Sequence, residues 1–320
     1  MGMIAALLVQ GLQMLLVVAV APLLVSIVRK VKSRLTRRQG APLVQPYRDL
    51  IRLMRKDVVL ADNASWLFRA VPYLVFASTW VAAALIPTFA TGLQFSWTAD
   101  LIAIVALLGS ARFFLALAGM DVGTSFGGIG SSREMMIASM AEPAMMLIVF
   151  SLALIAGSTQ LFTVAQFMAS SEVGLRVSLG MALVALVIVA LAENARIPVD
   201  NPTTHLELTM VHEAMVLEYS GRHLAMIELS SALKLVLYVS LIGCIFVPWG
   251  IADSDAGDSL AAYVLAVFLY LLKLGVGGVA LAVFETSIAK MRVFRVPNFV
   301  GIALMLALLG TLLLFVTRSL

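Results

Sequence analysis

Long apolar stretches separated by short polar ones dominate this chain. A helix of about 20 apolar residues can cross the hydrocarbon core of a membrane. No alternation of apolar and polar residues, the pattern typical of strands, competes with these stretches. The pattern predicts an all-α polytopic membrane protein, one transmembrane helical domain over residues 1–320. We expect about eight spans, at 3–28, 68–90, 100–119, 135–158, 174–193, 229–250, 259–283 and 298–318.

The composition agrees with this class. Hydrophobic residues make up 62% of the chain and charged ones only 12%, with a mean hydropathy of +1.03, values typical of membrane proteins. The run 3–28 is too long for the apolar part of a signal peptide, so we interpret it as a retained helix. The lone Cys244 lies in an apolar run. It cannot anchor a disulfide framework, a zinc site or an iron–sulfur cluster, and we predict no metal bound by this chain.

Basic residues gather in alternate loops. Half of the 22 Lys and Arg residues lie between 29 and 69, whereas the loop 91–99 has none and 251–258 is acidic. The positive-inside rule therefore predicts that loops at about 29–67, 120–134, 194–228 and 284–297 are cytoplasmic and that both termini lie outside. This topology accounts for the basic residues, so we expect no nucleic-acid partner. The polar motifs all fall on the cytoplasmic side, which suggests a soluble partner there.

The first of these loops contains a short amphipathic helix. Apolar residues at Tyr47, Leu50, Ile51 and Met54 share one helical face, and most basic residues point away from it. Two interpretations stay open: an interfacial helix held by anionic lipid, and a docking platform for a soluble partner.

A glycine-rich segment, DVGTSFGGIGSSRE, precedes the fourth span. It lacks the last Gly of a dinucleotide fingerprint and the Lys-Ser/Thr of a phosphate loop, and no strand precedes it. We interpret it as a flexible loop leading into a helix capped by Ser131 or Ser132, with Glu134 in the first turn.

Glu142 is the acidic residue that the apolar pattern explains least. It lies about two turns inside the predicted fourth span, directly before Pro143. A carboxyl in lipid costs several kcal/mol unless it is neutral, paired or facing water. Structural pairing is one explanation, and a role in proton or ion movement is the other.

The segment 193–221 is dense in titratable groups. Asn201 followed by Pro202 predicts the start of a helix, on which His205 and His212 share one face and Glu207 and Glu218 another. No zinc-protease signature or nucleophile motif is present, and hydrogen-bonded histidines explain this pattern better than a metal site. Apolar residues between the charges indicate a largely buried segment. Close carboxylates repel when all are ionised, so we expect proton sharing, as in a relay; a solvated acidic loop is the alternative.

Three cations lie within predicted spans: Arg112, Lys234 and Lys273. With Glu142 they predict a charged axis across the membrane, because such residues usually line polar pathways. Static ion pairs are the alternative.

Four segments carry a resemblance to a known family. They are ENARIPVDNPTTHLELTMVHEAMVLEYSGRHLAMIELSSALK (193–234), QPYRDLIRLMRK (45–56), GGIGSSREMMIASMAEP (127–143) and ETSIAKMRVFRVP (285–297). They resemble the membrane component shared by formate hydrogenlyase and hydrogenase-4, which belongs to the group 4 [NiFe] hydrogenases and is related to the H subunit of respiratory complex I. The likeness runs through nearly the whole chain.

The resemblance implies a coupling and anchoring role in the bacterial inner membrane. The expected partners are hydrogenase large and small subunits, an iron–sulfur subunit and antiporter-like membrane subunits, besides the bilayer. The [NiFe] centre and the iron–sulfur clusters would belong to those partners, and the chain itself would bind no cofactor. Complex I relatives read RAPFDLPE-like where this chain reads RIPVDNPT (196–203). The departure favours the hydrogenase branch over a quinone-site subunit; a purely structural anchor is a third possibility.

The sequence thus yields two sets of site candidates. The resemblance implies proton-path roles for Glu142, Glu193, Asp200, Glu207, Glu213 and Glu218, to which we add Glu228, Arg112, Lys234 and Lys273. The partner-docking candidates are Arg48, Arg52, Arg133, Arg196, His205, His212, Arg292 and Arg295.

Overall fold

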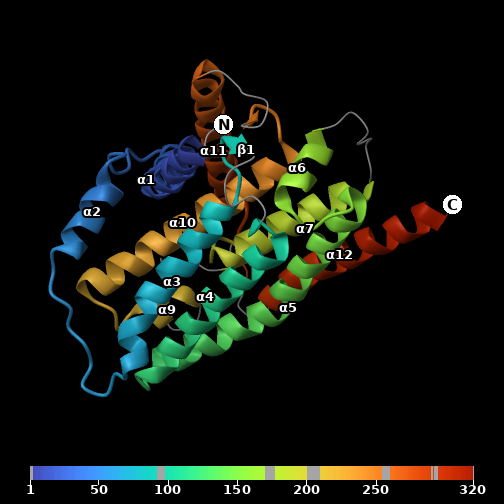
Figure 1. Ribbon diagram of the computed structural model, residues 1–320. Helices are drawn as coiled ribbons and strands as arrows, with labels where there is room; N and C mark the ends of the chain where they lie inside the picture. Colours follow the sequence, from blue (N-terminus) through green and yellow to red (C-terminus); the bar gives the residue numbers. More distant parts are fainter. Residues whose placement is uncertain are drawn as a thin grey trace.

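The computed structural model describes residues 3–91, 98–169, 177–199, 210–253, 260–289, 291 and 295–319. Long helices run up and down through a bundle (Figure 1). They are α1 (Met3–Leu35), α3 (Trp66–Leu85), α4 (Leu101–Asp121), α5 (Ser125–Ala156), α7 (Val177–Glu193), α10 (Gly221–Phe246), α11 (Leu260–Ser287) and α12 (Val296–Ser319). Shorter helices are α2 (Gln45–Met54), α6 (Leu161–Ala169) and α9 (His212–Val216). The two-residue strands β1 (Ala90–Thr91) and β2 (Ala252–Asp253) pair in parallel. The predicted all-α class is confirmed.

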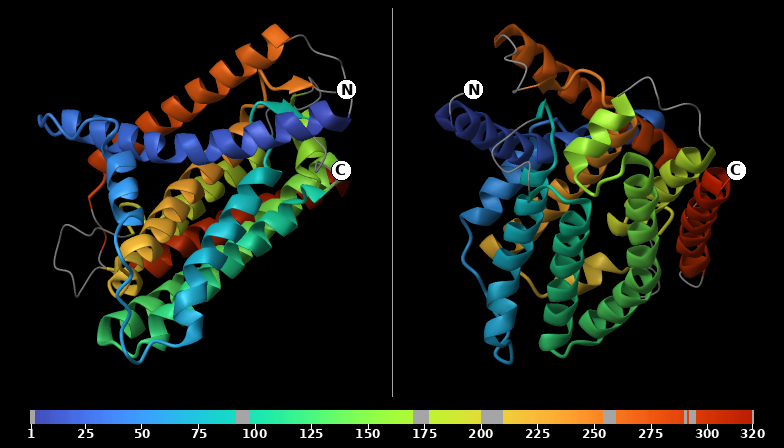
Figure 2. Two further views of the ribbon diagram at one scale, coloured as in Figure 1. Left: turned by 60° about the vertical axis from the view of Figure 1, so that its left-hand side comes forward. Right: turned by 45° about the vertical axis from the view of Figure 1, so that its right-hand side comes forward.

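Seven of the described helices are long and apolar enough to cross a membrane: α1, α3, α4, α5, α10, α11 and α12. The eighth expected span corresponds to α7, an apolar helix of 17 residues. At 1.5 Å per residue it is about 25 Å long, slightly less than a hydrocarbon core of about 30 Å. Helix α1 begins and α12 ends toward the same end of the bundle (Figure 2). Which side of the membrane that end faces stays a prediction.

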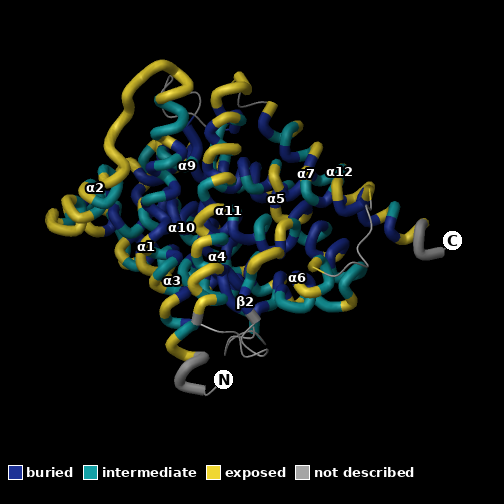
Figure 3. Tube along the Cα trace, turned by 90° about the horizontal axis from the view of Figure 1, so that it is seen from above, coloured by how far each residue is buried: buried dark blue, intermediate teal, exposed yellow. Residues whose placement is uncertain are grey.

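Helix α10 is the central helix of the bundle. In its most apolar stretch 61% of the residues are buried, against 22% in α11 and 28% in α12. It packs against α1, α3, α7 and α11, while α12 covers α5 and α7. Buried segments accordingly gather in the middle of the bundle and exposed ones around it (Figure 3). The apolar outer faces of α11 and α12 fit contact with lipid or with neighbouring membrane subunits.

The glycine-rich segment is helical, so its prediction as a flexible loop was wrong. Helix α5 begins at Ser125, and its N-cap is Thr124, whose side chain accepts a hydrogen bond from the backbone N–H of Gly127. Neither Ser131 nor Ser132 is the cap. The reason is tertiary: a Cβ on Gly127 would lie 2.0 Å from the carbonyl oxygen of Gly119 on α4. The glycines allow two helices to touch through their backbones.

Helix α10 also begins earlier than predicted, at Gly221 instead of near residue 229. Gly221 has a φ of +53° and lies against the backbone of the segment after α2. The predicted helix over 47–54 is confirmed as α2, with Pro46 in its first turn. Its Tyr47 hydroxyl donates a 2.5 Å hydrogen bond to the Ala19 carbonyl of α1.

Side chains from neighbouring helices satisfy carbonyl groups at two helix ends. Gln13 of α1 donates through its amide to the Ile86 carbonyl at the end of α3, at 2.8 Å. Lys273 of α11 donates to the carbonyls of Val247, at 2.6 Å, and Trp249, just beyond α10. A cation at a helix C-terminus is favourable because it meets unpaired carbonyls and the negative end of the helix dipole.

Replacing Lys273 with Met is therefore expected to loosen the end of α10. The change removes a cation from helix-terminal carbonyls, which costs about 1 kcal/mol. Thermal unfolding of the detergent-solubilised protein should occur a few degrees lower than in the unchanged protein. Lys56→Met, on an exposed lysine, is the control; equal midpoints for the two variants would contradict the capping role.

Candidate functional site: a buried charge cluster beside an open cavity

A buried arginine joins three carboxylates inside the bundle. Arg112 of α4 is 5% exposed. Its Nε lies 3.3 Å from Glu134 Oε1, its Nη1 lies 3.7 Å from Glu142 Oε1, and its Nη2 contacts Glu193 Oε1. Lys234 of α10 completes the cluster, with Nζ 2.9 Å from Glu193 Oε2. We call these five residues the charge cluster.

Each member of the charge cluster comes from a long helix. Glu134 and Glu142 are separated by just over two turns of α5, so they project toward the same side of α4. Glu193 is the last residue of α7, and Lys234 lies in the middle of α10. The cluster therefore connects four helices at about the depth of Arg112, roughly 14 Å from the end of α4.

The charge cluster holds one more carboxylate than cations. Arg112 and Lys234 face Glu134, Glu142 and Glu193. Charges taken out of water interact strongly, so the charge on each of these side chains affects the others.

Glu142 is the member that reaches the outer surface of the bundle. Its side chain is 48% exposed, whereas that of Glu193 is 4% exposed. Gly109 of α4 leaves the room for it, since a Cβ there would lie 3.4 Å from Glu142 Oε1. A neighbouring subunit packed against α4 and α5 would meet this carboxylate.

A small cavity of about 40 Å³ lies against the charge cluster. One ordered water needs about 10–15 Å³ by this measure, so the space admits a few waters. Its lining includes Arg112, Glu134, Glu193 and Lys234, with Ser230 beside them. Arg112 Nε and Nη1 make no hydrogen bond within the described structure, and waters here are placed to accept from them.

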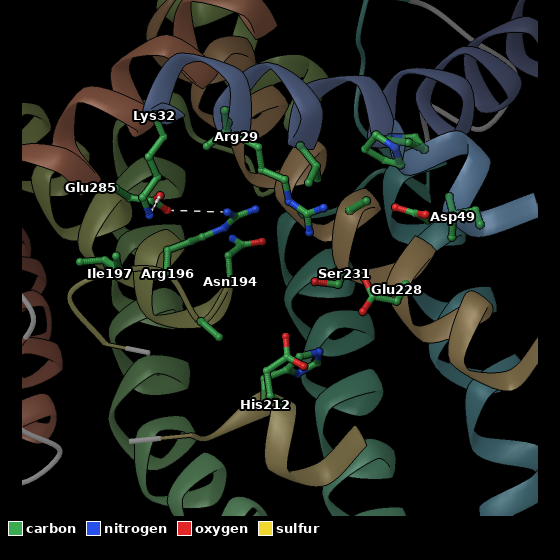
Figure 4. A pocket seen from close by; sticks show the side chains of 18 of the residues that line it. Arg29, Lys32, Asp49, Asn194, Arg196, Ile197, His212, Glu228, Ser231 and Glu285 are labelled. Carbon is green, nitrogen blue, oxygen red and sulfur yellow. Dashed lines mark hydrogen bonds and ion pairs between the residues drawn. The ribbon is translucent and has the colours of Figure 1, made fainter. Parts of the chain in front are cut away.

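A larger cavity, of about 430 Å³, opens beside the charge cluster. We call it the open cavity. Figure 4 shows charged side chains from several elements pointing into it. Helices α1, α2, α9, α10 and α11 and the segment 194–197 form its walls; the polar lining residues are Arg29, Lys32, Asp49, Asn194, Arg196, His212, Glu213, Glu228, Ser231 and Glu285. Pro22, Val25, Leu50 and Leu53 make part of the wall apolar.

A second set of buried ion pairs lies at one end of the open cavity. Glu285 of α11 is 5% exposed, and its carboxylate lies 3.0 Å from Lys32 Nζ and 3.7 Å from Arg196 Nη1 (Figure 4). Burial lowers the pKa of Arg196, and the Glu285 charge opposes that shift. These pairs tie α1, α11 and the segment after α7 together.

The structure brings together four of the predicted proton-path residues: Arg112, Glu142, Glu193 and Lys234. Glu213 and Glu228 line the open cavity, while Glu218 is exposed beyond the end of α9. Lys273 does not join them: its ammonium group donates to the carbonyls of Val247 and Trp249 at the end of α10. Asp200 and Glu207 lie outside the described residues.

The predicted docking residues divide into two groups. Arg48, Arg52 and Arg295 are exposed, which a docking role requires. The others that the structure describes have internal contacts: Arg133 donates a 2.9 Å hydrogen bond to the Met210 carbonyl, Arg196 pairs with Glu285, and His212 lines the open cavity. His205 and Arg292 lie outside the described residues.

Sequence reasoning missed Glu134 and Glu285 as buried partners. The spacing of Glu134 and Glu142 on one helix face was a usable signal, but the incorrect start of α5 put Glu134 at a helix end. Glu285 lies at the end of a long apolar run, where an acidic residue is expected to be solvated. Nothing local indicates that Lys32, far away in sequence, lies opposite it.

Within the described ranges, no group of three or more His, Cys, Asp or Glu residues is placed to hold a metal ion. The charged side chains that the structure describes are instead arranged as ion pairs between helices.

Comparisons with known proteins agree on one family. The chain is 33% identical over 288 residues to formate hydrogenlyase subunit 4 of Escherichia coli, covering 90% of this chain and 92% of that one. It is 31% identical to hydrogenase-4 component C of the same organism over 93% of this chain and 92% of that one. It is 28% identical to the H subunit of the NADH-quinone oxidoreductase of Salinibacter ruber, over 66% of this chain and 63% of that one.

The fold is also that of a solved membrane protein chain. A chain in the structure of the membrane-bound sulfane sulfur reductase, an archaeal respiratory membrane complex, superposes with a TM-score of 0.79. The match covers 97% of this chain and 99% of that chain at 19% identity, which establishes likeness of fold. The relatives are subunits of multi-subunit membrane complexes, and the apolar helices make this chain a multi-pass protein of the bacterial inner membrane.

The expectation that this is a membrane subunit related to those of formate hydrogenlyase, hydrogenase-4 and complex I is confirmed by these matches. Residues 8–316 match the NADH dehydrogenase family, so the chain belongs to that family.

Proposed function

We propose that this chain is the integral-membrane coupling and anchoring subunit of an energy-converting [NiFe] hydrogenase complex of the formate hydrogenlyase type. It links a soluble redox module to translocation of protons or sodium ions. The observation that carries the proposal is the charge cluster, in which two cations contact two buried carboxylates and the half-exposed Glu142 among four helices. It lies next to the open cavity.

The charge cluster supports coupling because its charge can change. A change of charge in a redox module docked over the open cavity alters the affinity of the surplus carboxylate for a proton. Glu142 is half exposed on the surface of α5, where antiporter-like membrane subunits would receive the effect. The chain thus relays charge between partners and performs no redox chemistry of its own.

The partners supply the redox centres in this proposal. Hydrogenase large and small subunits and an iron–sulfur subunit would hold the [NiFe] centre and the clusters; this is supported by the names of the two Escherichia coli relatives described above. Among the docking candidates, Arg48, Arg52 and Arg295 are exposed and could contact these partners. Exposed charges at the edge of an interface mainly speed up the association of the two proteins and make it depend on salt concentration.

Replacing Glu142 with Gln tests the proposal. The change removes the titratable group that reaches the bundle surface while keeping its size and one hydrogen-bonding oxygen. In the whole complex reconstituted in vesicles, we expect ion translocation per H₂ evolved to fall at least about tenfold, since proton transfer groups contribute that much or more. H₂ evolution from a reduced dye should change little.

Asp62→Asn is the control, because Asp62 is exposed and lies outside both the charge cluster and the open cavity. Equal losses of translocation and H₂ evolution would indicate a purely structural anchor. Unchanged translocation in the Glu142 variant would contradict the coupling role.

A quinone site is a second candidate function, favoured by the open cavity. Its volume of about 430 Å³ and its mixed apolar and charged walls suit a small amphipathic ligand. The same purified complex distinguishes the two functions. Nickel and H₂ evolution support the hydrogenase role, whereas a nickel-free complex that reduces quinone, and is inhibited by quinone analogues, supports the second.

A further inference from the structure

The open cavity and the small cavity at the charge cluster are neighbours. Four residues line both of them: Asn194, Ala195, His212 and Ser231. Among these, His212 alone has a side chain that titrates near neutral pH. Figure 4 shows it projecting from α9 toward the open cavity. His212 therefore stands where a proton would pass from one cavity to the other.

Close packing fixes the position of α9. A Cβ on Gly130 of α5 would lie 2.9 Å from the Val211 carbonyl oxygen and 3.0 Å from Ala214 Cβ. Arg133, one turn further along α5, donates a 2.9 Å hydrogen bond to the Met210 carbonyl. The residues on both sides of His212 are thus held against α5, and the imidazole is presented in a defined place.

Charged groups surround His212 from every element that packs nearby. Glu134 of α5 and Lys234 of α10 are the charges that act on it most directly. Glu213 follows it on α9, and Glu228 of α10 lines the same cavity. Glu193 and Arg112 lie across the small cavity. Burial lowers the pKa of His212, which favours the neutral ring, with one nitrogen that donates and one that accepts.

We propose that His212 carries protons between the open cavity and the charge cluster. A proton from water or from the Glu213 or Glu228 side binds the accepting ring nitrogen. The imidazolium then releases the proton on its other nitrogen to the Glu134 or Glu193 carboxylate through water in the small cavity, which all three residues line. The neutral ring returns by exchange of its tautomer, so no other reactant is consumed. This step rests on the coupling function proposed above.

The role differs from the docking contact that the sequence predicts for His212. A docking residue has to be exposed, whereas His212 is half-buried and lines the small cavity beside the charge cluster. It also explains why the segment 127–133 carries both a glycine that receives α9 and an arginine that holds it.

His212→Gln in the whole complex tests the inference. Glutamine hydrogen-bonds but does not titrate, so we expect ion translocation per H₂ evolved to fall at least about tenfold, while dye-driven H₂ evolution stays within about twofold. His223→Gln is the matched control: His223 is buried on α10 and lines neither cavity. Ion translocation per H₂ evolved in the His223 variant should equal that of the unchanged complex.

His212→Ala with added imidazole separates a proton carrier from a packing residue. The truncation leaves space next to the open cavity, and free imidazole should restore most of the lost translocation. Loss of translocation without rescue, together with lower yield of assembled complex, would mean that His212 only packs. Unchanged translocation in His212→Gln would also overturn the inference.

These outcomes are distinct from a failure of the proposed function. If Glu142→Gln lowers ion translocation per H₂ evolved and His212→Gln does not, the coupling function is supported. The proton then reaches the charge cluster by a route other than His212. If neither variant changes translocation, or the unchanged complex translocates no ions, the coupling function itself is wrong.

Discussion

Replacing Arg112 with Met is expected to prevent accumulation of folded protein. The methionine fills most of the space but leaves Glu134 and Glu193 buried with Lys234 as the remaining cation. Removing one partner of a buried ion pair typically costs about 3–5 kcal/mol, because a charge is left buried without its counter-charge, here that of Glu134. That is a large part of the stability of a typical protein, which is about 5–15 kcal/mol.

The measurement is the yield of monodisperse protein after detergent extraction, followed by thermal unfolding of what remains. Arg69→Met is the control, since Arg69 lies on α3 with an exposed side chain. It should change the yield and the unfolding midpoint little. An Arg112 variant with the same midpoint as the Arg69 variant would show that the charge cluster contributes nothing to stability.

A double variant identifies the cause. Adding Glu134→Gln to Arg112→Met removes the carboxylate that loses its paired cation, so part of the lost stability should return. Residues in contact deviate from additivity by about 0.5–3 kcal/mol. Simple addition of the two single effects would indicate that lost packing, and not unpaired charge, explains the first result.

Replacing Gly127 with Ala is expected to have the second large effect. Alanine normally favours a helix over glycine by about 1 kcal/mol. Here its Cβ would lie 2.0 Å from the carbonyl oxygen of Gly119, a backbone atom that cannot move without shifting α4. Overpacking in a protein interior typically costs about 1–3 kcal/mol, and a backbone contact leaves little room to relax.

A shift of α4 away from α5 at position 127 would also affect neighbouring contacts. Ser131 donates a 2.8 Å hydrogen bond from α5 to the Ala116 carbonyl of α4, and Gly130 receives α9. Separating α4 from α5 strains both contacts, so we expect a lower midpoint of thermal unfolding and weaker coupling.

Gly128→Ala is the matched control for this change. It lies next to Gly127 on the same helix, but no atom lies within 4 Å of its Cβ position. This variant should unfold at the same temperature as the unchanged protein or slightly above it, because only helix propensity acts. Equal midpoints for the Gly127 and Gly128 variants would contradict the backbone contact between α4 and α5.

Much of the architecture follows from local pattern. The length of each apolar run predicts a membrane helix, and the spacing of Tyr47, Leu50, Ile51 and Met54 predicts α2. Ionisable residues inside apolar runs also single out Arg112, Glu142 and Lys234 without knowledge of the fold. These features can be predicted from the sequence because each depends on residues close together in the chain.

Errors arose where a residue's role depends on a distant segment. The glycines of 127–130 have the pattern of loop residues, yet they are helical because α4 and α9 approach them. Lys273 and Lys234 are both predicted as buried cations, but the rotation of each helix directs one to carbonyl groups and the other to Glu193. Glu134 and Glu285 became recognisable as buried partners only when their counter-charges were in place.

The sequence by itself determined that this is an all-α membrane protein of a known family, with costly charges inside its spans. It did so because transfer of apolar groups from water and of charges into lipid is governed by composition over a single run of residues. Only the tertiary structure decided which charges meet, that Arg112 joins three carboxylates, and that His212 lies between two cavities. Ion pairs and cavities depend on the relative rotation and depth of several helices, which packing across the whole bundle sets.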